Sequence, residues 1–255
     1  MNPTIVPAVQ RTAGEVAAVF DGVFATIDSW HARVEAHLSS PAGRATASLD
    51  SLVESFAIPA VETHDLLTGA GFVCAPGLLR DAAWHLAWWL SDRSTGTRRL
   101  ATVDDPDNEQ FRDYTALEWW RVPAVTHARH LTGPYVDYVC TDDYTVTITQ
   151  PVIVGGELLG VVGVDALVDR LETELLPVLR ATGRPASIVN FSGRVVTSTE
   201  SRMEPGSILR VEGLSAALAP LRDPQPPALD LTLGNGSRVI SCGDTSLALV
   251  VAPPA

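Results

Sequence analysis

Residues 133–172 read GPYVDYVCTDDYTVTITQPVIVGGELLGVVGVDALVDRLE, and this stretch decides the fold class. Two runs rich in Val, Ile and Thr, residues 145–154 and 157–167, favour β-strands, and Gly155-Gly156 between them indicates a tight antiparallel hairpin. Residues 169–179 follow with the spacing of an amphipathic helix. Along the whole chain, helices come first and antiparallel strands later, without βαβ alternation. The sequence therefore predicts an α+β fold.

Upstream of this stretch, residues 8–38 have the pattern of one long helix. Its apolar side chains are spaced by alternating steps of four and three, at Val9, Ala13, Val16, Phe20, Val23, Ile27, Trp30 and Val34. The stripe can pack along its own domain or against a second copy of the chain. We expect a homodimer through this helix, because one sheet covers only part of a helix roughly 45 Å long. A second helix is predicted over residues 45–57, ended by Pro59.

The remaining segments read as strands, turns and short helices. Strands are predicted within residues 71–77 and 83–92, with a short helix within residues 111–123 for which Asp113 is a candidate N-cap. Hairpins are predicted at Ser192-Gly193, Asn235-Gly236 and Gly243-Asp244. We expect three parts: a helical, dimer-forming region (residues 1–60), a ligand-binding domain (61–200), and C-terminal strands (201–255) that complete the main sheet or form a small subdomain.

Composition excludes several classes of function. The 255 residues carry 18 basic and 30 acidic side chains, a formal net charge of −12, which disfavours direct binding to nucleic acid. All the basic residues are Arg, so no lysine-dependent mechanism is available. The cysteines, Cys74, Cys140 and Cys242, have no zinc-site spacing. No uniformly apolar stretch is long enough to cross a membrane, and no signal peptide is recognisable, so we expect a cytoplasmic protein without a membrane partner.

Aromatic and acidic side chains concentrate between residues 114 and 144. The cluster consists of Trp119, Trp120, Tyr135, Tyr138 and Tyr144 with Asp137, Asp142 and Asp143. Aromatic faces and carboxylates together suit a ligand with a cationic head and an apolar body. The alternative is an aromatic core beneath a long loop. His127 and His130 are too few ligands to predict a metal site, and we expect a solvated loop there.

These residues also resemble a known family, the Cache domain, a PAS-like sensor module of chemoreceptors and histidine kinases. The resemblance rests on PYVDY, TVTITQPV and GGELLGVVGVDA, spans roughly residues 8–200, and implies a long N-terminal helix packed on a PAS-like antiparallel sheet. In amino-acid-binding members an Arg-x-Trp-Tyr segment contacts the ligand's carboxylate and body. Here Leu117-Glu118-Trp119-Trp120 stands in its place, so the carboxylate-binding Arg is missing. Arg112 and Arg121 are near, but neither aligns with that Arg.

The resemblance further implies that Tyr135 and Asp165 hold the ligand's amino group. We therefore predict a stand-alone sensor domain for an amine-bearing or amino-acid-like metabolite, which passes its state to a separate partner such as a transcription regulator. No cofactor, metal or catalytic residue is predicted. An enzyme that uses Asp137, Asp142, Asp143 or Asp165 as acid and base is the alternative, and a scaffold with a vestigial pocket is a third possibility. The predicted ligand-binding residues are Tyr114, Trp119, Trp120, Arg121, Tyr135, Asp137 and Asp165.

Overall fold

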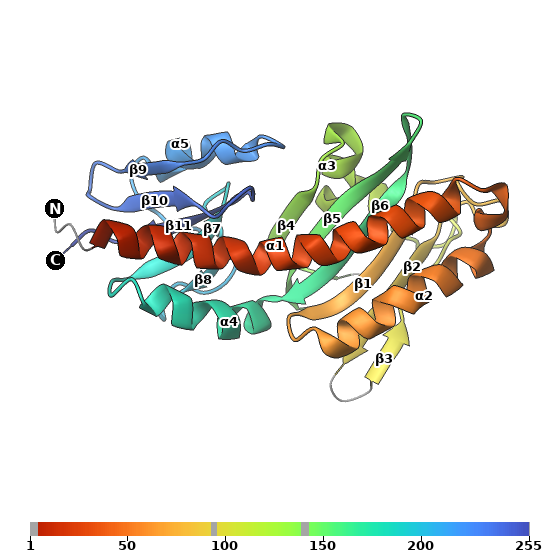
Figure 1. Ribbon diagram of the computed structural model, residues 1–255, viewed down its shortest axis with the longest axis horizontal. Helices are drawn as coiled ribbons and strands as arrows, with labels where there is room; N and C mark the ends of the chain where they lie inside the picture. Colours follow the sequence, from red (N-terminus) through yellow and green to blue (C-terminus); the bar gives the residue numbers. More distant parts are fainter. Residues whose placement is uncertain (1–4, 93–95, 139–142, 255) are drawn as a thin grey trace.

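The computed structural model describes residues 5–92, 96–138 and 143–254 (Figure 1). Two of the residues singled out above, Cys140 and Asp142, lie outside the described ranges. The chain forms two antiparallel sheets, and the first helix, α1 (Ile5–Leu38), runs along both of them (Figure 1). The predicted long helix is thus confirmed, with a start three residues earlier than expected.

The apolar stripe of α1 is covered within a single chain. All eight stripe residues are at most 5% exposed, because the helix packs against strands of both sheets and against the second helix. Trp30, for example, stacks on Phe56 with ring centroids 4.9 Å apart. The reasoning that one sheet would leave this stripe exposed for a second copy is therefore wrong: a second sheet covers the remainder of the helix.

The second helix, α2 (Thr46–Thr63), follows a short 3-10 turn, η1 (Pro41–Gly43), and covers the first sheet beside α1. The expectation that Pro59 ends this helix is wrong, because the helix continues for four residues beyond it. A proline removes one backbone donor and disfavours the preceding turn. Here the buried residues Phe56, Ala57 and Val61 hold the last turns against the core on both sides of that position.

The first sheet has six strands in the order β3-β2-β1-β6-β5-β4, all antiparallel. The strands are β1 (Leu67–Cys74), β2 (Leu86–Asp92), β3 (Gly96–Arg99), β4 (His130–Val136), β5 (Tyr144–Val154) and β6 (Glu157–Leu167). The hairpin at Gly155-Gly156 joins β5 to β6 as predicted. One face of this sheet packs on α1 and α2. The other face carries a separate aromatic core beneath η2 (Tyr114–Ala116) and α3 (Glu118–Thr126).

The second sheet has five strands in the order β8-β7-β11-β10-β9. They are β7 (Ala186–Asn190), β8 (Val195–Ser198), β9 (Asp230–Thr232), β10 (Arg238–Ser241) and β11 (Leu247–Val251). The amphipathic helix α4 (Val168–Arg180) leads into this sheet, and α5 (Leu214–Leu218) with η3 (Ala219–Arg222) covers its outer face. The strands before residue 200 thus pair with strands after it, so the sheet crosses the boundary expected there.

The C-terminal strands neither extend the first sheet nor form a subdomain by themselves, because they complete a second sheet with β7 and β8. β7, which precedes residue 200, pairs with β11, which follows it, through residues 186–190 and 247–251.

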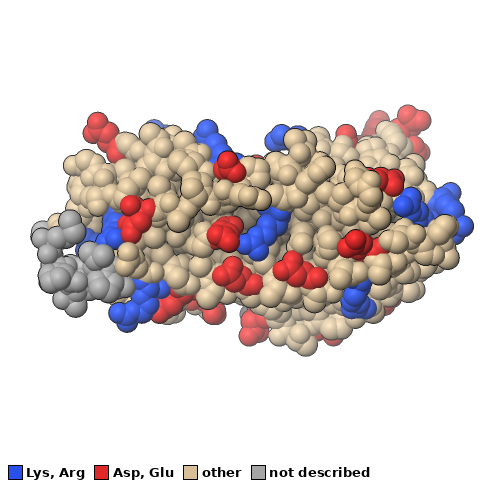
Figure 2. All heavy atoms as spheres, turned by 45° about the horizontal axis from the view of Figure 1, so that its top comes forward, with Lys and Arg blue, Asp and Glu red and all other residues tan. Residues whose placement is uncertain are grey.

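Among the described residues, no helix has the length and apolarity that a membrane crossing requires. The cytoplasmic location stays a prediction. Acidic side chains are spread over the face shown in Figure 2, with basic ones singly or in small groups between them.

Candidate functional site

A small cavity lies on the aromatic face of the first sheet, closed off by α3. Its volume is about 20 Å³, which is room for about one water molecule. The lining contains aromatic and aliphatic side chains, two hydroxyls and two carboxyl groups, and consists of Val73, Leu86, Trp88, Trp119, Tyr135, Asp137, Thr147 and Asp165. No Arg or His is among these lining residues. The cavity is therefore an acidic site with apolar walls.

Asp165, near the end of β6, is the most constrained group in the cavity. Its side chain is buried, and its two oxygens accept hydrogen bonds from the Thr147 hydroxyl at 2.6 Å and from the Trp88 indole N–H at 3.1 Å. The Tyr135 hydroxyl lies 2.7 Å from the Thr147 oxygen. When Asp165 is ionised, Thr147 uses its only hydroxyl hydrogen in the bond to Asp165, so Tyr135 is then the donor to Thr147. Arg112 and Arg121, the two arginines near the Trp119 segment in the sequence, do not line the cavity.

The Asp165 carboxylate lies close to the sheet backbone at Gly69, where no side chain takes up the space. Gly69 on β1 pairs with Asp165 across the ladder. A Cβ added at Gly69 would lie 2.6 Å from the Asp165 Oδ2 atom and 2.7 Å from the Trp88 indole nitrogen. Real Cβ atoms do not come so near, so the absence of a side chain at this position allows the bond between Trp88 and Asp165 to form.

Two carboxyl groups, Asp137 and Asp165, are buried side chains of the same cavity. Burial in a poorly solvated site, and secondly the neighbouring charge of Asp137, raise the pKa of Asp165 to about 7, while the hydrogen bonds from Thr147 and Trp88 oppose that rise. A strongly raised pKa in a cavity is a feature of functional sites. The arrangement favours a cation that neutralises the carboxylates.

Of the aromatic residues predicted for the site, some line the cavity and others pack behind it. Trp119 of α3 lines the cavity, and its carbonyl oxygen accepts a 2.8 Å hydrogen bond from Thr149 on β5, which ties the helix to the sheet. Trp120 packs behind it against Tyr114, with ring centroids 5.3 Å apart. The hydroxyl of Tyr114 donates to the Cys74 carbonyl at 2.8 Å. Trp120 and Tyr114 are thus buried supports that do not line the cavity.

Arg121 was also predicted for the site, but it does not line the cavity. Successive residues of a helix point in different directions, so Arg121 lies on a different side of α3 from Trp119 and lines a separate groove between the two modules. Sequence reasoning in turn missed Trp88 and Thr147. The period-two alternation of β2 does predict a shared face for Leu86, Trp88 and Leu90, and that face is the one that carries the cavity.

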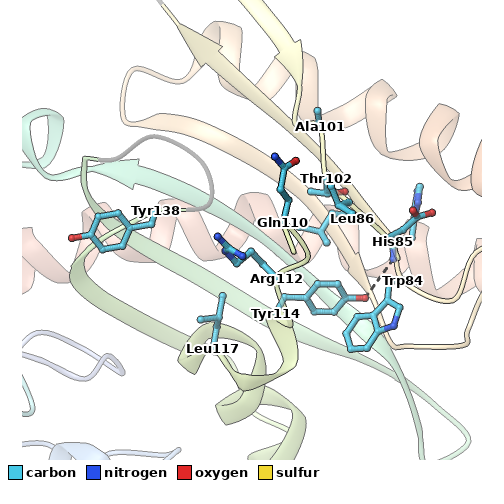
Figure 3. Close-up of a pocket in the computed structure, with 12 residues that line it drawn as sticks. Trp84, His85, Leu86, Ala101, Thr102, Gln110, Arg112, Tyr114, Leu117 and Tyr138 are labelled. Carbon is cyan, nitrogen blue, oxygen red and sulfur yellow. Dashed lines mark hydrogen bonds between the residues drawn. The ribbon is translucent and has the colours of Figure 1, made fainter. Parts of the chain in front are cut away.

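A larger depression of about 260 Å³ adjoins the cavity and shares Leu86 with it (Figure 3). It lies beside Tyr114 and is bordered by Trp84, Gln110 and Leu117. Arg112 projects into this depression, where its guanidinium donates to the carbonyl oxygens of Glu109 at 3.3 Å and Phe111 at 3.0 Å.

No group of three or more metal-ligating side chains occurs within the described ranges of the chain. Of the two histidines considered above, His130 is 3.0 Å from the Glu118 carboxylate. His127 is exposed and ends α3 in a left-handed backbone conformation. The two side chains therefore belong to different local environments. The thiols of Cys74 and Cys242 are buried and reduced, and burial raises the pKa of both.

Residues 62–173, which include the whole first sheet and the cavity, match the family model of the methyl-accepting chemotaxis protein-like first PDC sensor domain. No curated protein sequence matches the chain. Several solved structures do. The extracellular domain of mmHK1S-Z3, a protein assigned as a histidine kinase, is 15% identical, with a TM-score of 0.68 over 98% of this chain and 93% of its own.

Two chemoreceptor structures are similar over comparable lengths. Methyl-accepting chemotaxis protein X is 19% identical, with a TM-score of 0.56 over 98% of both chains. The sensory domain of the Campylobacter jejuni chemoreceptor Tlp3, solved with isoleucine bound, is 14% identical, with a TM-score of 0.57 over 96% of this chain and 89% of its own. These similarities confirm the α+β fold of a long helix on antiparallel sheets. They extend over both modules.

Proposed function

We propose that this chain, which has the fold of PDC sensor domains and carries their family match on its first module, is a small-molecule sensor whose ligand bears an amine. The observation that supports this most directly is the acidic cavity at Asp165. It holds two buried carboxyl groups among aromatic walls, without a basic side chain in its lining. A protonated amine is the ligand group that such a site complements best.

An ammonium group complements the buried Asp165 carboxyl in both charge and hydrogen bonding. It supplies a positive charge beside the buried Asp165 carboxyl, and its N–H groups donate hydrogen bonds to oxygens that Thr147 and Trp88 leave partly unused. Trp119 presents an aromatic wall, which attracts a cation through its π-face. The cavity has room for about one water molecule, and an ammonium head is of similar size.

The body of the ligand then extends from the cavity toward the depression that shares Leu86. Entry requires a movement of the covering segment, because the cavity alone is too small for a metabolite. That segment is η2 and α3: Trp119 of α3 lines the cavity, and Tyr114 of η2 stacks behind it with ring centroids 6.4 Å apart. A change in the position of this segment on binding is the conformational step that a sensor needs.

Leu117 distinguishes this site from the family pattern for α-amino acids. The Arg that would hold a carboxylate beside the amine is replaced by an uncharged side chain. Arg112 projects into the depression, at the far side of the shared wall. We therefore expect amines without a carboxylate, or amino acids whose carboxylate lies several bonds from the amine, to bind more tightly than simple α-amino acids.

The partner that receives the sensor's state is inferred from the comparisons. The similar structures belong to chemoreceptors and to a protein assigned as a histidine kinase, so an output of that kind is favoured over a transcription regulator. Ligand binding without chemical conversion is part of the proposal. The buried carboxyl pair is also what an acid–base enzyme would use, and the experiment below separates the two.

Isothermal titration calorimetry against matched amines, amino acids and carboxylates tests the proposal. Monoamines, ω-amino acids, α-amino acids and the corresponding carboxylates of equal chain length form the panel. We expect saturable binding by amine-bearing members, loss of that binding in Asp165→Asn, and unchanged binding in Asp28→Asn, which alters an exposed carboxylate on α1. Binding by carboxylates alone, or recovery of a chemically altered ligand by mass spectrometry, would contradict it.

A further inference from the structure

A groove of about 200 Å³ lies between the two modules. One wall is formed by α3 and the start of β4. The other is formed by the β7–β8 hairpin, η3 and the β10–β11 hairpin, and Phe24 of α1 also lines the groove. The modules touch beside it, where the buried Asn190 side chain donates to the Gly133 carbonyl at 2.7 Å. Grooves between modules are common ligand sites.

Two arginines from opposite walls project their charge into this groove, Arg121 from α3 and Arg222 from η3. Both side chains are exposed, and among the residues that the structure describes no carboxylate lies within ion-pair distance of either guanidinium. Of the other charged residues in the lining, Asp223 is exposed and its carboxylate accepts a 2.9 Å hydrogen bond from the Gln225 amide, whereas the rest have side-chain partners. Arg129 lies 4.1 Å above the Phe24 ring and 3.9 Å from Asp244, and His130 contacts the Glu118 carboxylate.

The rest of the lining is largely apolar. Phe191, Leu221, Pro224 and Pro226 are the apolar residues of the wall contributed by the second module. Arg222 has its guanidinium carbon 5.8 Å from the centre of the Phe191 ring. An apolar cavity of about 150 Å³ can already hold a benzene ring. The groove therefore has space and surface for a compact apolar body next to two guanidinium groups.

From this combination we infer that the groove between the modules binds a small organic carboxylate, held by Arg121 and Arg222 together. Guanidinium groups and carboxylates form charge-assisted hydrogen bonds of matched geometry, often with both oxygens engaged. The groove shares no lining residue with the acidic cavity, and it offers two arginines without an ion-pair partner among the described residues against one such carboxylate, Asp223. Because one arginine comes from each module, a bound carboxylate links the two modules and couples their relative position to a second ligand.

The test uses the whole chain and three probes with a carboxylate on different bodies, namely acetate, succinate and benzoate, with benzamide as the uncharged analogue of benzoate. We expect saturable binding of at least one carboxylate by calorimetry and no binding of benzamide. Arg121→Gln and Arg222→Gln should each weaken that binding roughly tenfold or more, the effect of losing one hydrogen bond to a charged group. Arg98→Gln, an exposed arginine on β3, is the matched control.

Thermal unfolding without ligand should be unchanged in both arginine variants, since neither side chain has an ion-pair partner to lose among the described residues. Carboxylate binding should also persist in Asp165→Asn, whereas amine binding should persist in Arg121→Gln. These two results keep the groove and the acidic cavity distinguishable. The inference is overturned if none of the three carboxylates binds saturably, if benzamide binds equally well, or if the double arginine variant retains full affinity.

Discussion

Replacing Asp165 with Asn should make the protein more stable at high pH while it weakens amine binding. The unfolded chain loses the proton of this carboxyl near pH 3.8, whereas the folded chain keeps it until about pH 7. Between these values the folded state binds more protons, so the free energy of unfolding falls as the pH rises. At about 1.36 kcal/mol for each pH unit, the full cost above pH 7 is roughly 4 kcal/mol.

Asn cannot ionise, so this cost is absent in the variant. Its amide oxygen can accept from Thr147, but its NH₂ group cannot accept from the Trp88 indole, which adds a pH-independent loss of about 1–3 kcal/mol. The two effects separate when stability is measured at two pH values. Between about pH 5 and about pH 8, the free energy of unfolding of the variant should rise relative to the wild type by about 2–3 kcal/mol.

Urea unfolding of both proteins without ligand measures this difference, with Asp28→Asn as the control for an exposed carboxylate. Calorimetry on the same samples should show amine binding weakened by about 2–5 kcal/mol, the range for removing one partner of a buried charge pair. The reasoning is refuted if the stability difference between wild type and Asp165→Asn is the same at both pH values, or if it changes in the opposite direction.

Gly69→Ala should destabilise the protein by about 1–3 kcal/mol in urea unfolding and weaken amine binding, because the new methyl group would lie 2.6 Å from the Asp165 carboxylate. Gly14→Ala, in open space on α1, should not destabilise, and an equal loss in both variants would contradict the steric argument. Ile27→Ala in the α1 stripe should cost about 2–5 kcal/mol, with unfolding midpoints independent of protein concentration because the stripe is buried within one chain. A concentration-dependent midpoint would place the stripe in an interface instead. Finally, the isolated chain should not shift random duplex DNA in a mobility assay, given its net charge of −12.

Much of the local structure could be predicted from the sequence, because it depends on neighbouring residues. The three-four spacing of α1, the glycine pairs at the hairpins and the Asp113 cap of η2, whose carboxylate accepts from the Thr115 amide at 2.8 Å, all act over a few positions. The resemblance likewise identified Tyr135 and Asp165, and the aromatic and acidic cluster pointed to Asp137; the structure brings all three to one cavity with Trp119.

The partners of Asp165 could not be predicted, because they depend on register. Counting back from the hairpin, where Val154 faces Glu157, would place Thr147 opposite Val164. A bulge between Val152 and Ile153 shifts the pairing by one residue, so that Thr147 faces Asp165. Since side chains alternate between faces, this one-residue shift decides whether the hydroxyl reaches the carboxylate.

What the sequence alone determined is therefore the set of elements and the residue types available to the site. The tertiary structure decided which surfaces remain exposed. It buried the α1 stripe under two sheets, so the apolar spacing that suggested a dimer is used within one chain. It also placed Arg121 in the groove between the modules and away from the cavity. The physical reason is that burial and proximity depend on contacts between residues far apart in the chain, whereas sequence patterns report on neighbours a few positions away.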